Sequence, residues 1–256
     1  MKKFVLIVLV LGLTGSCKKK KTQEEETTPV TPPVTVAQNP VTDINVPADA
    51  DGALWASQIP YEFTNFYVTQ LGKSSAFFYS APGNYSCVDA GVVKCNDSVL
   101  VKVSGGSFLF SGKAINGQPY SGINYASGAT WTVAGTTSVP AFSVSAPSFP
   151  TPPALTSSTL ISKAAPYVLT YSGVTNADSV VIILNGDSTF RQKKTVVSSA
   201  GSFTFTAAEI GKIKKIGSGL FPYLTMISYN MQSTAVSAKK YYFINSNTST
   251  YRINTY

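Results

Sequence analysis

Short runs of apolar residues alternate with polar residues along most of this 256-residue chain. The runs are rich in Val, Ile, Thr, Phe and Tyr, and clusters of Gly, Asn, Asp and Ser separate them. A period of two places successive side chains on opposite faces of a strand. In 202–206, for example, Phe203 and Phe205 share one face while Ser202 and Thr204 share the other. The pattern predicts an all-β fold.

The second half of the chain carries enough such runs for a complete sandwich. Seven or eight strands in about 105 residues suit an immunoglobulin-like sandwich. Thr206 and Glu209 have the spacing of a capping box and predict a short helix, and Asn185-Gly186 predicts a hairpin turn. The expected strands lie at 159–162, 167–172, 179–185, 189–197, 202–206, 223–230, 238–245 and 251–256.

The first half shows the same pattern, so we expect two tandem antiparallel sandwiches of this kind. Four prolines in 147–156 resist both helix and central strand, which places the boundary near residue 151. The predicted sandwiches cover 44–151 and 152–256. The expected strands of the first lie at 53–59, 75–80, 99–103, 107–112, 129–135 and 141–145.

The first sixteen residues have the order of a signal peptide. Lys2 and Lys3 precede an apolar run from Phe4 to Leu13, and small residues follow it. Ten apolar residues form a helix of about 15 Å, half of the roughly 30 Å that a bilayer core requires. We therefore expect residues 1–16 to be removed.

The segment around Cys17, LTGSCKKKK, resembles a lipoprotein cleavage box, although Leu13 lies one position further from the cysteine than is usual. The resemblance implies that Cys17 becomes the first mature residue and carries a diacylglyceryl group. The alternative is an ordinary signal peptide with Cys17 as a free thiol, but three cysteines leave one odd unless Cys17 is modified. Attachment to the membrane through this lipid would be permanent, because several acyl chains are involved.

Residues 17–43 are expected to form a disordered tether. Its charged part, with lysines 18–21 and glutamates 24–26, resembles an export tag for the outer face; a solvated spacer is the equal alternative. The part at 27–40 is rich in Pro and Thr and favours an extended, semi-rigid stalk. The tether would hold the sandwiches away from the membrane.

Cys87 and Cys95 are the remaining cysteines, and we expect a disulfide between them. A turn around Ala90, Gly91 and Val92 would place the two sulfurs opposite one another on adjacent strands, in an oxidising compartment. The alternative is a pair of buried, reduced thiols on strands that do not meet.

The composition removes most catalytic chemistry. The chain contains no histidine, which excludes Ser-His-Asp, Cys-His and His-zinc schemes. Nothing in the sequence pairs two of the acidic residues as a glycosidase requires. We therefore expect no catalytic residue, no metal site and no cofactor.

Aromatic residues are the remaining candidates for a ligand site. Trp131 alternates with threonines and is predicted to lie in a core. Trp55 is harder to place, and Tyr241 and Tyr242 lie in the expected strand 238–245, the last but one. If one face is exposed, Trp55, Tyr241 and Tyr242 could form a platform for a sugar ring, although packing in the sheet is the simpler role for the tyrosines.

Charge differs between the two halves. Residues 152–256 hold ten Lys or Arg against three acids, whereas residues 44–151 hold four against five. The basic half could meet an anionic partner, but lysines on exposed strands also block edge-to-edge pairing. No nucleic-acid-binding motif accompanies these charges, so we expect no nucleic-acid partner.

The segments DAGVVKCNDSVL (89–100) and ATWTVAGTTSVPAF (129–142) resemble surface lipoproteins of Bacteroides-like bacteria with immunoglobulin-like domains. This resemblance implies architecture and an outer-membrane location, on either the periplasmic or the exposed face, and it assigns no chemistry. We expect a non-enzymatic lipid-anchored protein that serves as a spacer and interaction module, for a glycan or another envelope protein. The alternative is a carbohydrate-binding accessory protein in glycan capture.

Overall fold

The computed structural model describes residues 43–63, 67–110, 113–115, 118–146, 148–186, 190–213 and 222–256. The predicted signal peptide, Cys17 and the tether up to residue 42 lie outside this part. No helix within the described residues is long and apolar enough to cross a bilayer.

The described chain is almost entirely β-structure, which confirms the predicted all-β sandwich class. The strands of the first half are β1 (Gly52–Phe63), β2 (Tyr67–Ala81), β3 (Asn84–Cys87), β4 (Val93–Cys95), β5 (Ser98–Val99), β6 (Val101–Lys102), β7 (Phe108–Phe110), β8 (Lys113–Ile115), β9 (Gln118–Ser121), β10 (Ala129–Val133) and β11 (Phe142–Ala146). The second half contains β12 (Ala154–Leu155), β13 (Leu160–Ile161), β14 (Tyr167–Ser172), β15 (Ser179–Asn185), β16 (Arg191–Val197), the 3₁₀ turn η1 (Ser198–Ala200), β17 (Ser202–Phe205), α1 (Ala207–Gly211), β18 (Tyr223–Val236), β19 (Lys239–Arg252) and β20 (Asn254–Thr255).

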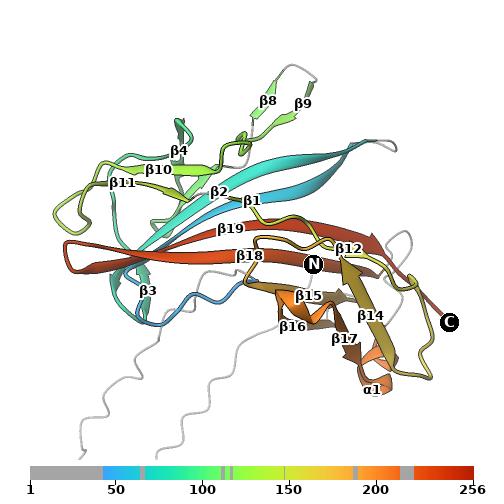
Figure 1. The fold of residues 1–256 in the computed structure, drawn as a ribbon. Coiled ribbons are helices and arrows are strands. Elements are labelled where there is room, and N and C mark those ends of the chain that lie inside the picture. The colour runs from blue at the N-terminus through green and yellow to red at the C-terminus, as the bar shows by residue number, and fades with distance from the viewer. Residues whose placement is uncertain are drawn as a thin grey trace, which may run out of the picture. The chain divides into compact units, whose positions relative to one another are not determined.

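One nine-stranded sheet contains strands from both halves of the chain (Figure 1). Its order is β16-β15-β18-β19-β1-β2-β7-β6, and β3 pairs with β2 beside this path. The two halves meet where β1 runs parallel to β19, from Gly52 opposite Tyr241 to Gln58 opposite Asn247. The predicted boundary near residue 151 falls between β11 and β12, so strands from both sides of it share this sheet.

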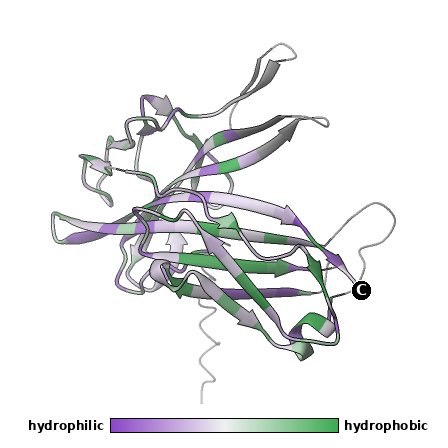
Figure 2. Cartoon of the chain, turned by 45° about the vertical axis from the view of Figure 1, so that its right-hand side comes forward, coloured by the Kyte–Doolittle hydropathy of each residue, from purple (hydrophilic) through white to green (hydrophobic). Residues whose placement is uncertain are grey.

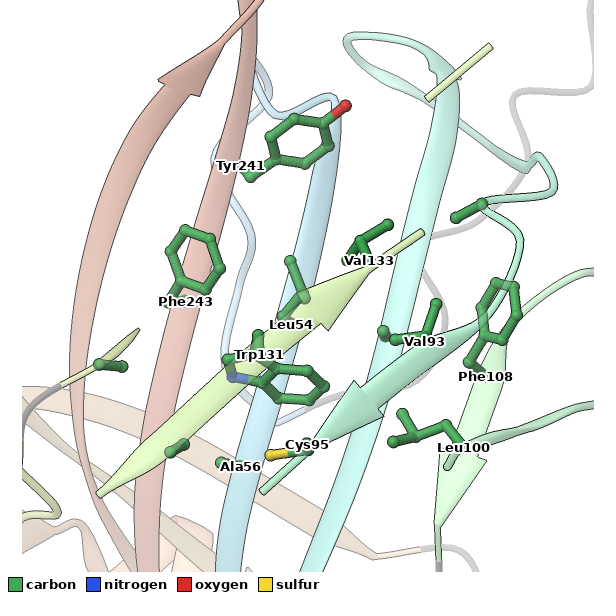
Figure 3. Close-up of a cluster of buried hydrophobic side chains, with 14 of the residues drawn as sticks. Leu54, Ala56, Val93, Cys95, Leu100, Phe108, Trp131, Val133, Tyr241 and Phe243 are labelled. Atoms are coloured by element: carbon green, nitrogen blue, oxygen red, sulfur yellow. The ribbon is translucent and has the colours of Figure 1, made fainter. Parts of the chain in front are cut away.

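A first hydrophobic core lies between the nine-stranded sheet and a four-stranded sheet of order β11-β10-β4-β5. Leu54 and Ala56 of β1 face this core together with Trp131 of β10, which is fully buried as predicted (Figure 3). Tyr241 and Phe243 of β19 also belong to it. The second half of the chain therefore supplies part of the core of the first half.

A second core lies further along the same face of the sheet. Ile182 of β15 and Met226 of β18 pack there against Leu169 of β14 and Phe205 of β17, strands of the sheet β12-β14-β17. Phe203 and Phe205 both contact this core, with ring centroids 5.0 Å apart, as their spacing in the sequence predicts. Figure 2 shows hydrophobic residues (green) and hydrophilic residues (purple) following one another along the same strands.

A third core covers the opposite face of the nine-stranded sheet. Alternation sends Trp55 and Ile244 to this face, whereas their neighbours Leu54 and Phe243 point to the first core. The segment before β1 also belongs to this core, through the buried side chains of Ile44, Val46 and Ala50. We call residues 43–50 the strap; it is the blue segment before β1 in Figure 1.

The proline-rich linker lies against the β18–β19 hairpin. Asn230 donates to the carbonyl of Ser148 through its Nδ2 (2.8 Å), and Ser228 Oγ donates to the carbonyl of Thr151 (2.7 Å). Ser228 and Asn245 are buried polar residues of the hairpin, and Asn245 also donates to Ser148 (3.3 Å). The segment predicted as a seam is thus held by side chains of the shared sheet.

The capping box predicted in the second half is confirmed, whereas Asn185 lies inside β15 and neither it nor Gly186 has the positive φ expected of a tight Asn-Gly turn. Glu209 N–H donates to Thr206 Oγ1 (3.2 Å), and Thr206 N–H donates to the Glu209 carboxylate (2.9 Å), which completes the capping box of α1. β15 and β16 form the predicted antiparallel hairpin, with Asn185 opposite Arg191. Residues 187–189 of its turn lie outside the described part.

Truncating Phe243 tests the sharing of the first core. Phe243→Ala removes a ring that is 2% exposed and should lower the free energy of unfolding by about 3 to 5 kcal/mol, because a cavity remains. The measurement is urea denaturation followed by tryptophan fluorescence, since Trp131 lies in the same core. Tyr256→Ala, at a residue 72% exposed, is the control and should change stability by less than about 0.5 kcal/mol. A similarly small loss for Phe243→Ala would contradict the shared core.

Candidate functional site

The face that carries the third core changes from apolar to hydroxyl-bearing residues along its central strands. On β19 the positions pointing to this face are Tyr242, Ile244, Ser246 and Thr248, and on β1 Trp55 is followed by Ser57. The parallel register sets Trp55 beside Ile244 and Ser57 beside Ser246. Ser246 Oγ donates to Ser57 Oγ at 2.9 Å. Side chains from the two ends of the described chain therefore form one polar surface.

A pocket of about 230 Å³ opens on this surface. Its lining from the sheet comprises Trp55, Ser57 and Ile59 of β1, Ser75 of β2, Ile227 of β18, and Ser246 and Thr248 of β19. Asp43 and Ile44 of the strap complete the lining. The pocket thus combines four side-chain hydroxyls with an aromatic ring and three isoleucines.

The strap is fixed by charged and polar contacts at both of its ends. Asp43 forms an ion pair with Arg191 of β16, and Lys193 Nζ lies 3.4 Å from Asn45 Oδ1. At the other end, Asp49 accepts hydrogen bonds from Lys240 Nζ (2.6 Å) and the Tyr242 hydroxyl (2.7 Å). These contacts hold Asp43 at the pocket.

The pocket's chemistry suits neutral hydrogen bonding and apolar contact. Asp43 is the one ionisable side chain among the lining residues that the structure describes, and Arg191 already pairs with it. Each Ser or Thr hydroxyl can donate one hydrogen bond and accept two. Ser246 and Thr248 are 3% and 8% exposed, and the Ser246 hydroxyl is already hydrogen-bonded to Ser57.

The predicted aromatic platform is wrong as an exposed surface. Trp55, Tyr241 and Tyr242 are 4%, 0% and 8% exposed. Tyr241 and Tyr242 point to opposite faces of the sheet because they are consecutive in β19, and burial raises the pKa of the Tyr241 hydroxyl to about 12. Trp55 packs edge-on against Phe77, with ring centroids 5.7 Å apart, and still lines the pocket. Of the three residues, Trp55 alone belongs to the candidate site.

The predicted Cys87–Cys95 disulfide is also wrong, because both thiols are free. β3 pairs with β2 in the large sheet, whereas β4 pairs with β5 and β10 in the four-stranded sheet. Cys95 is fully buried in the first core (Figure 3), and Cys87 packs against the third core on the other side of the sheet. The alternative of two thiols on strands that do not meet is the observed one.

Five of the ten basic side chains that made the second half a candidate for an anionic partner contact named groups within the chain. Lys194 pairs with Glu209 (3.2 Å), Lys240 with Asp49, and Lys239 Nζ donates to the carbonyl of Ser138 (2.8 Å). Arg191 and Lys193 contact the strap, as described above. Lys214 and Lys215 lie outside the described residues. The basic residues thus hold segments of this chain together.

No protein-family model matches the chain, and a search of curated proteins finds no relative. The resemblance to surface lipoproteins of Bacteroides-like bacteria stays a prediction. The role of the pocket must therefore follow from the residues that line it.

Sequence reasoning identified Trp55 but missed the hydroxyls beside it. The four pocket hydroxyls share a strand face with buried apolar residues such as Trp55, Phe77 and Ile244, and polar residues in that phase were a detectable signal. Their convergence was not detectable, since it depends on the parallel pairing of β1 with β19.

The free thiols can be tested by alkylation of the Cys17→Ser chain, in which Cys87 and Cys95 are the remaining cysteines. Burial raises the pKa of Cys95 to about 11 and that of Cys87 above its usual value, so few thiolates form near neutral pH. We expect iodoacetamide at pH 7.5 to leave Cys95 unmodified and to modify Cys87 more slowly than in the urea-denatured chain. Peptide mapping without reductant supplies the readout, and a Cys87–Cys95 crosslinked peptide would contradict the structure.

Neutralising Asp49 should loosen the strap. Hydrogen bonds from Lys240 and Tyr242 lower the pKa of the Asp49 carboxyl, so its stabilising effect is present above about pH 4 and is lost as pH falls through that lowered pKa. In Asp49→Asn we expect faster amide exchange in 44–50 at pH 7, and a smaller further rise in exchange on acidification than in the wild type. Hydrogen-exchange mass spectrometry, corrected for intrinsic rates, measures both.

Asp97→Asn is the control for this measurement, because Asp97 lies in the exposed turn between β4 and β5 and Asn tolerates its positive φ of 63°. Unchanged protection of 44–50 in Asp49→Asn at pH 7 would show that the apolar contacts of the strap suffice without the carboxylate.

Proposed function

We propose that this chain is a lipid-anchored protein of the outer membrane that acts as a non-enzymatic interaction and spacer module. The observation that supports a binding role is the pocket on the hydroxyl-bearing face, where polar and apolar side chains converge around a volume of about 230 Å³. Its single ionisable lining residue, Asp43, is already paired with Arg191, so the described lining favours holding a ligand over transforming it.

The spacer role is supported by the order of tether and fold along the sequence. The Pro/Thr-rich segment 27–40 leads directly into the strap, whose first described residue, Asp43, lines the pocket. An extended tether anchored at Cys17 would present the pocket at a distance from the membrane. The ion pairs of the strap with β16 and β19 would fix the end of the tether to the sheet.

A second candidate function, glycan capture, is favoured by the composition of the pocket. Ring-shaped polyhydroxylated ligands offer both hydroxyls and apolar C–H faces, and the pocket provides Trp55 together with four hydroxyl groups. In this version the interaction module is an accessory protein that binds carbohydrate at the cell surface.

The anchor can be tested on the chain expressed in a Gram-negative host. We expect the mature N-terminus at Cys17 with a diacylglyceryl mass increment, and a protein that partitions into the membrane fraction. Cys17→Ser should release the chain into the soluble fraction, because the acyl chains supply nearly all of the membrane affinity. Cys87→Ser is the matched control and should stay in the membrane. An unmodified mature N-terminus elsewhere than Cys17 would refute the proposal.

A further inference from the structure

We propose that the pocket on the open sheet face binds a single uncharged pyranose ring. This inference rests on the proposed binding role of the same pocket and adds the chemical class and size of its ligand.

The volume favours a ligand of one ring. Pockets that enclose drug-sized molecules measure about 300 to 1,000 Å³. The pocket here, at about 230 Å³, lies below that range. A single sugar ring, free or at the end of a chain that continues into solvent, is the size of ligand that such a pocket can enclose.

The lining groups match the two kinds of surface on a pyranose. Ser57, Ser75 and Thr248 place hydroxyls on β1, β2 and β19, so a ring in the pocket meets polar groups from three neighbouring strands. Such groups can exchange donor and acceptor roles with sugar hydroxyls. Trp55 and Ile227 provide apolar surface for the C–H groups of the ring.

The backbone of the pocket floor argues against an extended peptide as the ligand. A peptide that adds to a sheet needs a strand with free N–H and C=O groups. β1 is paired with β19 on one side and β2 on the other, and β18 is paired with β15 and β19. The floor therefore offers side chains and no open strand edge.

The charge of the pocket selects against acidic sugars. Asp43 lines the pocket, and its carboxylate pairs with Arg191, which is not among the lining residues. Lys193 Nζ also donates to the Asp43 carbonyl (3.3 Å), so both cations beside Asp43 are engaged with the strap. A ligand carboxylate would lose its hydration in the pocket without meeting an unpaired cation among the lining residues, whereas a neutral ring avoids this cost.

Ligand-observed NMR on the mature full-length protein, in a detergent without a sugar headgroup, tests the proposal. The probes are the methyl glycosides of glucose, galactose, mannose and N-acetylglucosamine, with methyl glucuronide as the charged counterpart. We expect at least one neutral glycoside to bind with a dissociation constant on the order of 1 mM, as suits a small ligand. Methyl glucuronide should bind at least about fivefold more weakly than methyl glucoside, or show no binding where the glucoside binds.

Two matched pairs of variants locate the binding. Thr248→Val removes a lining hydroxyl and keeps the shape of the side chain, so affinity should fall about three- to tenfold. Thr250→Val changes an exposed residue of the same strand that points to the same face, and it should bind as the wild type does. Ser75→Leu should abolish binding by filling the pocket, whereas Ser80→Leu, at an exposed position of β2, should not. Unchanged melting temperatures show that each variant is folded.

The outcomes separate this inference from the proposed function. Absence of binding by every neutral glycoside at 20 mM, or equal losses in Thr248→Val and Thr250→Val, would overturn the sugar pocket. A lipidated, membrane-bound chain with no sugar binding would leave the interaction module standing. Sugar binding by a chain whose mature N-terminus carries no lipid would support the sugar pocket and contradict the proposed lipid anchor.

Discussion

The parallel pairing of β1 with β19 is the interaction on which the rest of the structure depends. It joins the start and the end of the described chain in one sheet, from Gly52 opposite Tyr241 onwards. Because side chains alternate along both strands, this one register supplies Leu54 and Phe243 to the first core and Trp55 and Ile244 to the third. A shift by one residue would exchange the two faces. The same register places Ser57 beside Ser246 and so builds the floor of the pocket.

Charge in this protein works mainly to position a short segment of backbone. The residues of the strap lie outside the strands, yet they cover apolar residues of the third core. Ion pairs of Asp43 and Asp49 with Arg191 and Lys240 secure it at the two ends. Exposed ion pairs contribute little to stability one at a time. Here they act together with the burial of Ile44, Val46 and Ala50, and they determine which strap residues face the pocket.

Local sequence predicted the strands of the second half well, missed β3, β4, β8 and β9 of the first half, and predicted the pairing of strands poorly. Alternation identified the strands around Trp131 and Phe205, and the Thr206–Glu209 spacing located α1, since these signals depend on neighbouring residues only. The Cys87–Cys95 prediction failed because proximity in sequence was taken for pairing, while β3 and β4 join different sheets. The hydroxyls of the pocket come from strands far apart in the chain, and no local rule relates Ser57 to Ser246.

The distance in sequence between β1 and β19 has a consequence for how the chain acquires its fold. Ribosomes synthesise β1 long before β19, so one edge of β1 has no partner until β19 has been made. Closing so long a loop slows folding, and an open strand edge is prone to pair with other chains. A nascent chain of this topology would benefit from a holding factor that shields that edge until the C-terminal hairpin has emerged.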